Sequence, residues 1–354
     1  MDVAAVIVNF RTPASTVEAV TAVLRELEGF EEPRVIVVDN DSQDGSLDQL
    51  KKVFVDPVWG DRVTVVNSGH NGGYGYGINV GVRQLLALPR SPRLVYVINP
   101  DAVVDPGSLK RLVSFMDEHP DAGLLGCHIY SPSGEEVKAF RFPSFWGEFE
   151  STARTAVFTR LLRKHRLPVW PTESCEVDWV SGTSMLIRGE VLKSSVLFDE
   201  GFFLYFEEVD FARRVRQAGW KVYYVDGASV GHVGSLSTGM TDEARRMPEY
   251  WFQARRRYLV KHHGPAYGAA CDLAWICGYA VCVAKSTLLR RSVAFRPRLW
   301  RDFIRYSAAN LMTPAPDAEQ NVLTMHPAAS SVSSTSSGST PAPLASAIAS
   351  EIAK

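Results

Sequence analysis

Residues 35–46 read VIVVDNDSQDGS, and this stretch decides the fold class. Four β-branched residues in succession predict a strand buried on both faces, and Asp39 follows where the strand ends. The runs VAAVIV, VTVV and LVYVI, at residues 3–8, 63–66 and 94–98, repeat the pattern. Amphipathic stretches separate these runs. We therefore predict an α/β fold with a mainly parallel twisted sheet flanked by helices.

Two of the amphipathic stretches carry clear helix signals. Apolar residues recur at helical spacing at Val17, Val20, Leu24 and Leu27, and again at Leu109, Leu112, Val113 and Met116. Thr12 and Pro13 precede the first set, which predicts an N-cap residue and a first-turn proline. The second set follows Pro106. Further strands are predicted at residues 123–129, 184–188 and 221–225.

The composition excludes several classes of protein. The chain has 354 residues, of which 46% are hydrophobic and 22% charged, so it is neither fully disordered, collagen-like nor a multi-span membrane protein. Five scattered cysteines without a C-x-x-C pair fit a reducing compartment. A strand-like run directly follows Met1-Asp2, so we expect no signal peptide and a protein kept in the cytoplasm.

The net charge of −1 conceals a basic region toward the C-terminus of the chain. Residues 251–310 hold eleven Lys and Arg against only Asp272 and Asp302, and within them residues 266–284 are mostly apolar. Arginines and aromatic residues then alternate, which suits anionic lipid headgroups. We predict that residues 241–312 form a basic, amphipathic helical region at a membrane interface. A true membrane span and an ordinary helical lid are the alternatives, and no nucleic-acid motif accompanies the charge.

Residues 313–354 form a third region by composition. Their Ser, Thr, Pro and Ala residues bury too little apolar surface to offset the chain entropy. We predict a disordered tail.

Polar residues follow four successive strands. Asn9 follows the first, Asp39 the second, a glycine-rich loop the third, and Asn99-Pro100-Asp101 the fourth. Ligands of open parallel sheets bind beyond the carboxyl ends of the strands, so these residues predict one binding crevice. The alternative for Asp39 is a cap on a helix that begins near Ser46.

The glycine-rich loop does not fit a dinucleotide-binding fingerprint. Gly73 and Gly75 would require a third glycine where Ile78 stands, and the turn after the first strand reads NFRTP, without glycine. The pattern therefore argues against a Rossmann dehydrogenase. The same turn lacks the Gly- and Lys-rich phosphate loop that a nucleotidyltransferase on a related sheet would need.

The order of these segments resembles the inverting glycosyltransferases of family 2, and within them the rhamnosyltransferase-like branch. The resemblance covers residues 3–240 and rests on seven segments: VIVNF, VVDNDSQDGS, NGGYGYGIN, NPDA, VSGTSMLIR, FDEGFFLYFEEVDFARRVRQAGW and HVGSLSTG. It implies the GT-A nucleotide-diphospho-sugar transferase fold, with residues 1–240 as the catalytic domain and a C-terminal helical extension.

The resemblance implies a donor site and a metal site. The implied donor-binding residues are Asn9, Asp39, Asn71, Asn79 and Asp101, with the loop glycines letting the backbone approach the nucleotide. A helix-start cap is the alternative for Asn79. Asp101 and His232 are the implied ligands of a divalent metal, Mg or Mn, although a lone histidine is ordinarily structural. Asn99 replaces the first carboxylate of the commoner D-x-D, so the nucleotide would hold much of the metal.

Three carboxylates and one loop complete the implied site. Glu208 matches the general base of the family, where an Asp is commoner, and Glu207 and Asp210 would support it. The helix dipole alone is the alternative explanation for all three. Residues matching the junction of donor and acceptor are Trp179, Gly182 and Thr183, although Trp179 fits core packing equally well.

The resemblance predicts an inverting transferase that acts in cell-surface polysaccharide synthesis. It would move a sugar, with rhamnose from dTDP-rhamnose as the best guess, to a hydroxyl of a glycan or lipid-linked saccharide at the inner face of the cytoplasmic membrane. The alternatives are another sugar (galactofuranosyl, glucosyl or N-acetylhexosaminyl) and a catalytically impaired scaffold, which the departures at Asn99 and Glu208 leave open.

Overall fold

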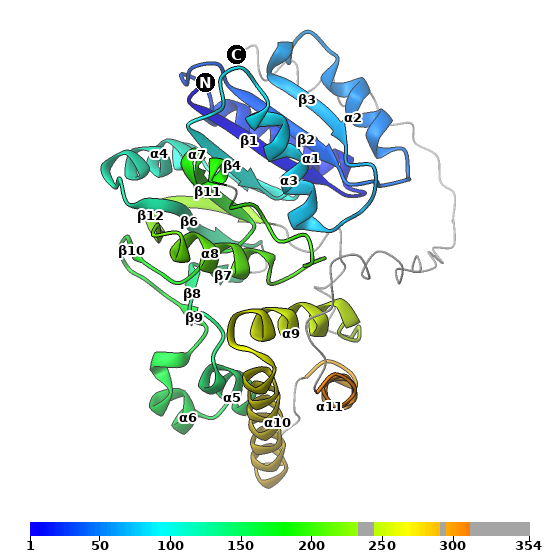
Figure 1. Ribbon diagram of the computed structural model, residues 1–354, viewed down its shortest axis with the longest axis vertical. Helices are drawn as coiled ribbons and strands as arrows, with labels where there is room; N and C mark the ends of the chain where they lie inside the picture. The colour runs from blue at the N-terminus through cyan, green and yellow to red at the C-terminus, as the bar shows by residue number, and fades with distance from the viewer. Residues whose placement is uncertain (133, 195, 233–243, 291–294, 312–354) are drawn as a thin grey trace.

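A computed structural model describes residues 1–132, 134–194, 196–232, 244–290 and 295–311. Its central sheet has the strand order β10-β12-β6-β11-β4-β1-β2-β3 (Figure 1). These strands are β1 (Val3–Asn9), β2 (Arg34–Asp39), β3 (Val63–Asn67), β4 (Leu94–Ile98), β6 (Ala122–Tyr130), β10 (Cys175–Glu176), β11 (Ser184–Arg188) and β12 (Lys221–His232). Two short strands join the sheet: β5 (Ala102–Val104) pairs with β12, and β7 (Glu136–Val137) pairs with β6. A separate two-stranded sheet consists of β8 (Ala139–Phe140) and β9 (Pro168–Val169).

The prediction of a mainly parallel sheet is confirmed. β3, β2, β1 and β4 run parallel, as do β6 and β12, whereas β11 is antiparallel to both of its neighbours. Every residue of β1 and β4 is buried, which explains why these strands read as unbroken apolar runs. The predicted strand at residues 221–225 is longer in the structure and reaches His232.

Helices cover both faces of the sheet. They are α1 (Pro13–Glu26), α2 (Ser46–Phe54), α3 (Tyr74–Leu86), α4 (Ser108–Glu118), α7 (Gly189–Lys193) and α8 (Glu207–Gln217). The odd-numbered residues of β1 pack with α1, α2 and α4, and the even-numbered ones pack with α3 and α8. This division follows from the alternation of side chains along a strand. It leaves the carboxyl ends of β1, β2 and β4 open to the loops that carry the predicted site.

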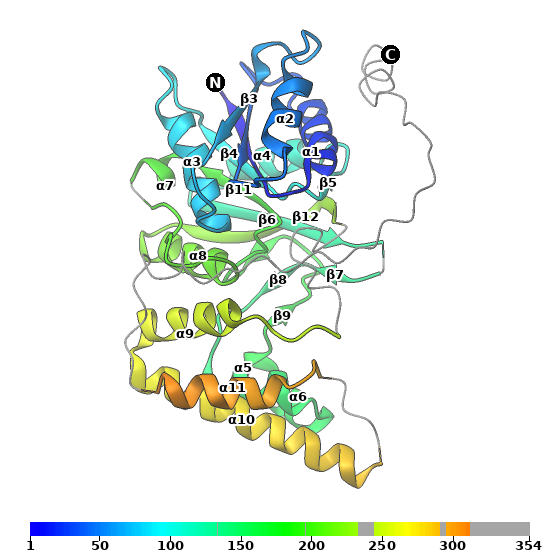
Figure 2. The same cartoon turned by 90° about the vertical axis from the view of Figure 1, so that its right-hand side faces the viewer.

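A helical lobe lies beyond one edge of this sheet domain, at the end remote from β3 and α2 (Figures 1 and 2). It is built from two separate parts of the chain. The first holds α5 (Phe145–Ala153), α6 (Ala156–Leu161) and the 3₁₀ turn Arg163–His165, and the second holds α9 (Glu249–His263), α10 (Pro265–Leu288) and α11 (Leu299–Ala309). The predicted tail at residues 313–354 lies outside the described residues.

A buried ion network holds the lobe together. Arg255 bonds to Glu148 on α5, with 2.9 Å between Nη2 and Oε2, and also pairs with Asp272 on α10. Arg256 lies 3.4 Å from the other oxygen of Asp272, and all four side chains are buried. Buried charges need such partners, so Asp272 interrupts the apolar run because it neutralises two arginines. The positive charge of this part of α9 is therefore compensated inside the lobe.

Helix α10 is the one helix among the described residues that is long and apolar enough to cross a membrane. Only 39% of its most apolar window is buried. Length and composition alone do not separate a span from a helix of a folded lobe. Its buried face packs against α5, α9 and α11, and its opposite face is exposed.

Candidate active site

The carboxyl ends of β1 and β2 are tied together by a buried polar cluster. Asn9 donates to Asp39, with 2.7 Å between Nδ2 and Oδ2, and Ser42 donates to both oxygens of the same carboxylate. The Oδ1 of Asn9 accepts from Thr16, at 2.9 Å, and from the backbone of Thr12. The cluster fixes the loop after β2, in which Asp41 has a φ of 57°.

The starts of α1 and α2 are settled by the structure. Thr12 is the N-cap residue of α1 and Pro13 its first residue, as predicted, although the Thr12 side chain makes no cap hydrogen bond. Asp39 does not cap α2, since Ser42 and Asn9 donate to its oxygens and Asp44 accepts from the backbone of Ser46 instead. The sequence alternative for Asp39 is thereby removed.

The loop after β3 returns to the same strand ends. Asn40 donates to the Oδ1 of Asn71 and to the carbonyl of Gly73, both at 3.0 Å. Asn71 also accepts from the backbone of Gly73, which forms a tight turn before α3. The structure therefore brings Asn9, Asp39 and Asn71 to one edge of the sheet, as the strand order predicted.

Asn79 takes a different position from its neighbours in the motif. It lies within α3, and its alternative as a helix-start cap is wrong because the helix begins at Tyr74. Its amide donates to the carbonyl of Phe198 and to Glu200, both at 2.8 Å, and accepts from the backbone of Phe198. Asn79 thus anchors the segment that leads to α8.

The glycines of the loop after β3 pack closely against other parts of the protein. A Cβ on Gly73, which has a φ of 92°, would lie 1.9 Å from the carbonyl oxygen of Phe203, so only glycine fits there. A Cβ on Gly77 would lie 2.6 Å from a side-chain carbon of Val8 on β1. The prediction gave these glycines the role of admitting the nucleotide, but in the structure they admit α3 to the sheet and to the segment before α8.

The pairing of β5 with β12 creates the predicted metal-binding pair. His232 lies opposite Ala102 in this pairing, which places its Nε2 3.1 Å from the Oδ1 of Asp101. The amide of Asn99 lies 3.4 Å from the same nitrogen. Residues 131 positions apart in the chain thus meet at the end of β4.

Glu207 and Glu208 begin α8 and face different neighbours. Glu207 lies against Gly75 of α3, whereas the Cβ of Glu208 would be 3.6 Å from a Cβ placed on Gly182. The Oε2 atoms of both glutamates are buried and have no hydrogen-bond partner within the part of the chain that the structure describes. Burial raises the pKa of Glu208 to about 7, and burial together with the charge of Glu208 raises that of Glu207 well above its usual range. A carboxylate that titrates near neutrality beside the junction segment is suited to proton transfer.

Asp210 is occupied by structural partners. It is fully buried, accepts from His262 at 2.8 Å, and pairs with Lys261 and Arg214, both at 2.7 Å. Burial raises the pKa of Asp210, but the hydrogen bond from His262 and the two cations outweigh it and hold that pKa well below its usual range. The residue therefore joins α8 to α9.

Tyr74 was not among the predicted site residues, although it stands inside the NGGYGYGIN motif. Its hydroxyl donates to the carbonyl of Gly182 at 3.0 Å. Burial, with the carboxylates of Glu207, Asp101 and Glu208 nearby, raises the pKa of Tyr74 well above its usual range. Tyr74 thus contacts the predicted junction segment at Gly182, which lies beside Glu208.

The predicted junction residues divide between two environments. Gly182 lies beside Glu208 and Tyr74, and the carbonyl of Thr183 accepts from the backbone of Asn99 at 2.9 Å. Trp179 instead stacks on Phe140, with 4.0 Å between the ring centroids, and donates to the carbonyl of Arg141. Packing against β8 therefore accounts for the orientation of its ring.

A profile described as "Glycosyltransferase like family 2" matches residues 1–259. The chain belongs to this glycosyltransferase family. It is therefore a glycosyltransferase, which transfers a sugar from a nucleotide-sugar donor.

Two curated relatives and one solved structure are similar to this glycosyltransferase. An N-acetylglucosaminyl-diphospho-decaprenol L-rhamnosyltransferase of Mycobacterium tuberculosis is 31% identical over 224 residues, which are 58% of this chain and 68% of the relative. The low-salt glycan biosynthesis hexosyltransferase Agl10 of Haloferax volcanii is 25% identical over 269 residues, 74% of this chain and 76% of the relative. A mannosyltransferase of Pyrobaculum calidifontis, solved with GDP-Man and Mn²⁺, superposes with a TM-score of 0.56 at 15% identity, covering 88% of this chain and 87% of that one. The likeness shows the GT-A fold.

The residues of this glycosyltransferase fit a divalent cation only in part. Asp101 and His232 offer one carboxylate and one imidazole, and Asn99 adds an amide oxygen. Among the described residues no group of three His, Cys, Asp or Glu side chains could hold a metal ion. Manganese and magnesium favour oxygen ligands in larger number, so a diphosphate would have to complete the set.

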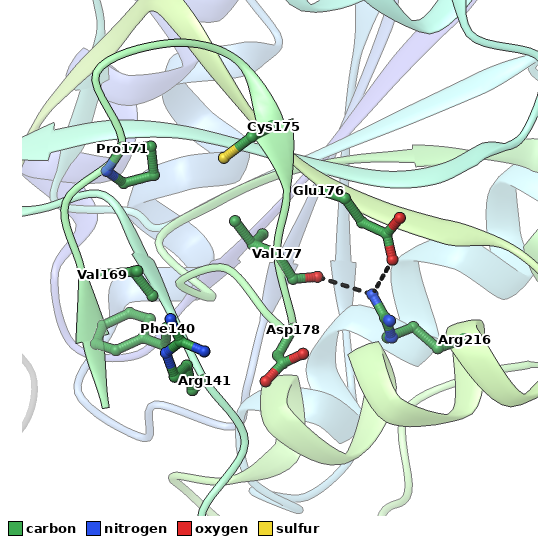
Figure 3. Close-up of a pocket in the computed structure, with 9 residues that line it drawn as sticks. All are labelled: Phe140, Arg141, Val169, Pro171, Cys175, Glu176, Val177, Asp178 and Arg216. Atoms are coloured by element: carbon green, nitrogen blue, oxygen red, sulfur yellow. Dashed lines mark hydrogen bonds and ion pairs between the residues drawn. The ribbon is translucent and has the colours of Figure 1, made fainter. Parts of the chain in front are cut away.

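A cavity of about 310 Å³ lies between β10, the β8–β9 sheet and α8 of the glycosyltransferase (Figure 3). Arg216 donates to the carbonyl of Val177 at 3.0 Å and pairs with Glu176 at 2.8 Å beside it. Phe140, which stacks on Trp179, forms part of its wall. None of the predicted site residues lines this cavity.

Proposed function

We propose that this glycosyltransferase is an inverting rhamnosyltransferase that acts on a hydroxyl of a glycan or lipid-linked saccharide in cell-surface polysaccharide synthesis. The observation that carries the inverting mechanism is the position of Glu208. One oxygen of its carboxylate has no hydrogen-bond partner among the described residues, burial raises its pKa to about 7, and it lies beside Gly182.

The reaction is a single displacement at the anomeric carbon. The acceptor oxygen forms a bond to this carbon while the bond from the carbon to the diphosphate oxygen breaks, and Glu208 takes the acceptor proton. Burial and the charge of Glu208 raise the pKa of Glu207 well above its usual range, whereas burial raises that of Glu208 to about 7, so we assign the role of base to Glu208.

The donor is proposed to bind across the strand ends. Asn9, Asp39 and Asn71 lie where the base and ribose would bind, and the polar cluster with Ser42 holds this wall in place. Asp101 and His232 would hold a divalent cation, which supplies charge neutralisation for the departing diphosphate. The solved mannosyltransferase with GDP-Man and Mn²⁺ supports this assignment.

Rhamnose is proposed as the sugar because the Mycobacterium tuberculosis relative is named a rhamnosyltransferase and shares 31% identity. The name of the same relative includes N-acetylglucosaminyl-diphospho-decaprenol, a lipid-linked saccharide, which supports a lipid-linked acceptor. Another hexose is the second candidate, because the Haloferax volcanii relative is named a hexosyltransferase.

The location is proposed to be the inner face of the cytoplasmic membrane, with the helical lobe in contact with anionic lipid. Exposed Arg298, Arg301 and Arg305 on and before α11 support this proposal. We propose that α10 lies at the interface and does not span the bilayer, since Asp272 in its first half is buried and paired with two arginines.

The test is a transfer assay with a panel of nucleotide sugars, Mn²⁺ and a synthetic lipid-linked diphospho-saccharide. We expect dTDP-rhamnose to give a glycosylated lipid of inverted anomeric configuration, which mass spectrometry and NMR detect. Transfer from a different donor would show that the transferred sugar is not rhamnose. Tight donor binding without transfer from any donor would favour the scaffold alternative.

A further inference from the structure

Helix α6 and the turn after it form an exposed basic segment in the middle of the chain. Between Glu150 and Glu173 there are five Lys and Arg residues and no acidic residue. Arg160, Arg163, Lys164 and Arg166 are all exposed, and no ion pair is recorded for them within the described ranges. The charge of this segment is therefore available to a partner, unlike that of Arg255 and Arg256 on α9.

The same helix exposes large apolar side chains. Val157 is 66% exposed and Leu161 is 71% exposed. Val157, Arg160 and Leu161 lie three and four residues apart on α6, so they share one side of that helix, and Lys164 follows in the 3₁₀ turn. A strip that presents aliphatic and cationic side chains together is typical of elements that lie at a lipid surface.

Helix α10 presents a second exposed strip. Its buried residues include Cys271, Trp275 and Cys282, and the exposed face opposite them carries no charge. The exposed strip consists of Leu273, Cys277, Ala280, Val283, Ala284, Thr287 and Leu288. Leu273 is 60% exposed and Leu288 is 84% exposed, so the strip is apolar along most of the helix.

The two strips belong to one end of the molecule. The ammonium of Lys285 on α10 donates to the carbonyl of Arg154, 2.9 Å away, directly before α6 begins. Helix α5, which leads into α6, packs along α10. Both views place α6 and α10 at the end remote from β3 and α2 (Figures 1 and 2).

We infer that α6 with its following turn and the exposed strip of α10 form one lipid-docking face, whose partner is an anionic bilayer surface. This inference rests on the proposed lipid-linked acceptor and deepens it, because it adds a segment from the centre of the chain to the C-terminal region. The aliphatic side chains enter the headgroup boundary, and the four cations pair with lipid phosphates. The ion pairs of Asp210 with α9 connect this lobe to the helix that carries Glu208, so docking would hold the crevice at a fixed height above the membrane.

The test is co-sedimentation of the full chain with vesicles of phosphatidylcholine, with and without phosphatidylglycerol. Each cation near an anionic surface contributes about fivefold to binding, so Arg160→Gln with Lys164→Gln should weaken binding to the anionic vesicles by roughly thirtyfold. Val157→Ser with Leu161→Ser should weaken it by about tenfold or more. The matched controls, at the opposite end of the molecule, are Lys51→Gln with Lys52→Gln on α2 and Val55→Ser directly after α2, where Val55 is 79% exposed.

The inference is overturned if the α6 variants bind anionic vesicles as tightly as the wild type, or if the α2 controls lose binding equally. It is also overturned if the wild type binds RNA but no vesicles. Transfer to a water-soluble acceptor analogue separates this failure from that of the proposed function. We expect the α6 variants to keep the wild-type rate with that analogue and to lose rate only with vesicle-embedded acceptor.

Discussion

Replacement of Glu208 by glutamine removes the proposed base and preserves the shape of the side chain. Glu208 lies beside Gly182. Its Oε2 atom has no hydrogen-bond partner within the described residues, so Glu208→Gln does not break a hydrogen bond of this atom there. Loss of a positioned general base costs about 10²–10⁴-fold in rate. We therefore expect kcat to fall by that factor and the donor dissociation constant to stay near its wild-type value.

The pH dependence gives this prediction a second, independent readout. The base acts in its ionised form, and burial raises the pKa of Glu208 to about 7, so wild-type kcat should rise with pH through neutrality and level off above it. In Glu208→Gln this limb should vanish, whereas Glu208→Asp should keep it together with much of the activity.

The assay is the initial rate of nucleoside diphosphate release at saturating donor and acceptor, across a pH series on both sides of neutrality. Glu190→Gln is the matched control, because Glu190 is an exposed carboxylate on α7. Full activity of Glu208→Gln, or a wild-type rate that is flat through neutrality, refutes the assignment. If Asp210→Asn is inactive in a folded protein while Glu208→Gln is active, the base is Asp210.

Three further variants test the rest of the site. Asp210→Asn should lower the free energy of unfolding by about 3–5 kcal/mol in urea titrations near neutrality, because it leaves Lys261 and Arg214 without their buried partner. This difference should shrink as the pH falls through the depressed pKa of the folded state, and a difference that is unchanged in acid would contradict the ion-pair explanation. Tyr74→Phe removes the 3.0 Å bond to the Gly182 carbonyl and should lower kcat about three- to tenfold at unchanged donor KM, whereas an equal rise in KM would show a donor-binding role. Asp101→Ala should abolish transfer and, in calorimetry, Mn²⁺ binding in the presence of nucleoside diphosphate, in a protein that circular dichroism shows to be folded; a wild-type rate at saturating donor would exclude the metal role.

The sheet could be predicted from sequence because its strands are buried on both faces. The run VIVV shows no amphipathic alternation, and the polar residue after each such run marks where the strand must leave the core. β12 was predicted too short because its second half, from Asp226 to His232, contains glycine, serine and a register shift, which interrupt the apolar pattern. That second half carries His232 to Asp101.

Contacts between distant segments could not be predicted from local patterns. Asn79 lies in a motif that suggested donor binding, yet its partners at Phe198 and Glu200 are about 120 positions away. The charges of α9 suggested an exposed basic face, but Arg255, Arg256 and Lys261 meet carboxylates from other elements. Periodicity reports which face of an element is apolar and says nothing of which ion-pair partner the fold supplies.

The most direct measurement of the central claim is a structure of the protein with a nucleoside diphosphate and Mn²⁺. The proposed function predicts the base and ribose beside Asn9 and Asp39, the diphosphate and the metal beside Asp101 and His232, and Glu208 facing the space that the transferred sugar would occupy. A nucleotide bound in the cavity between β10 and α8, or a diphosphate without contact to Asp101, would contradict it.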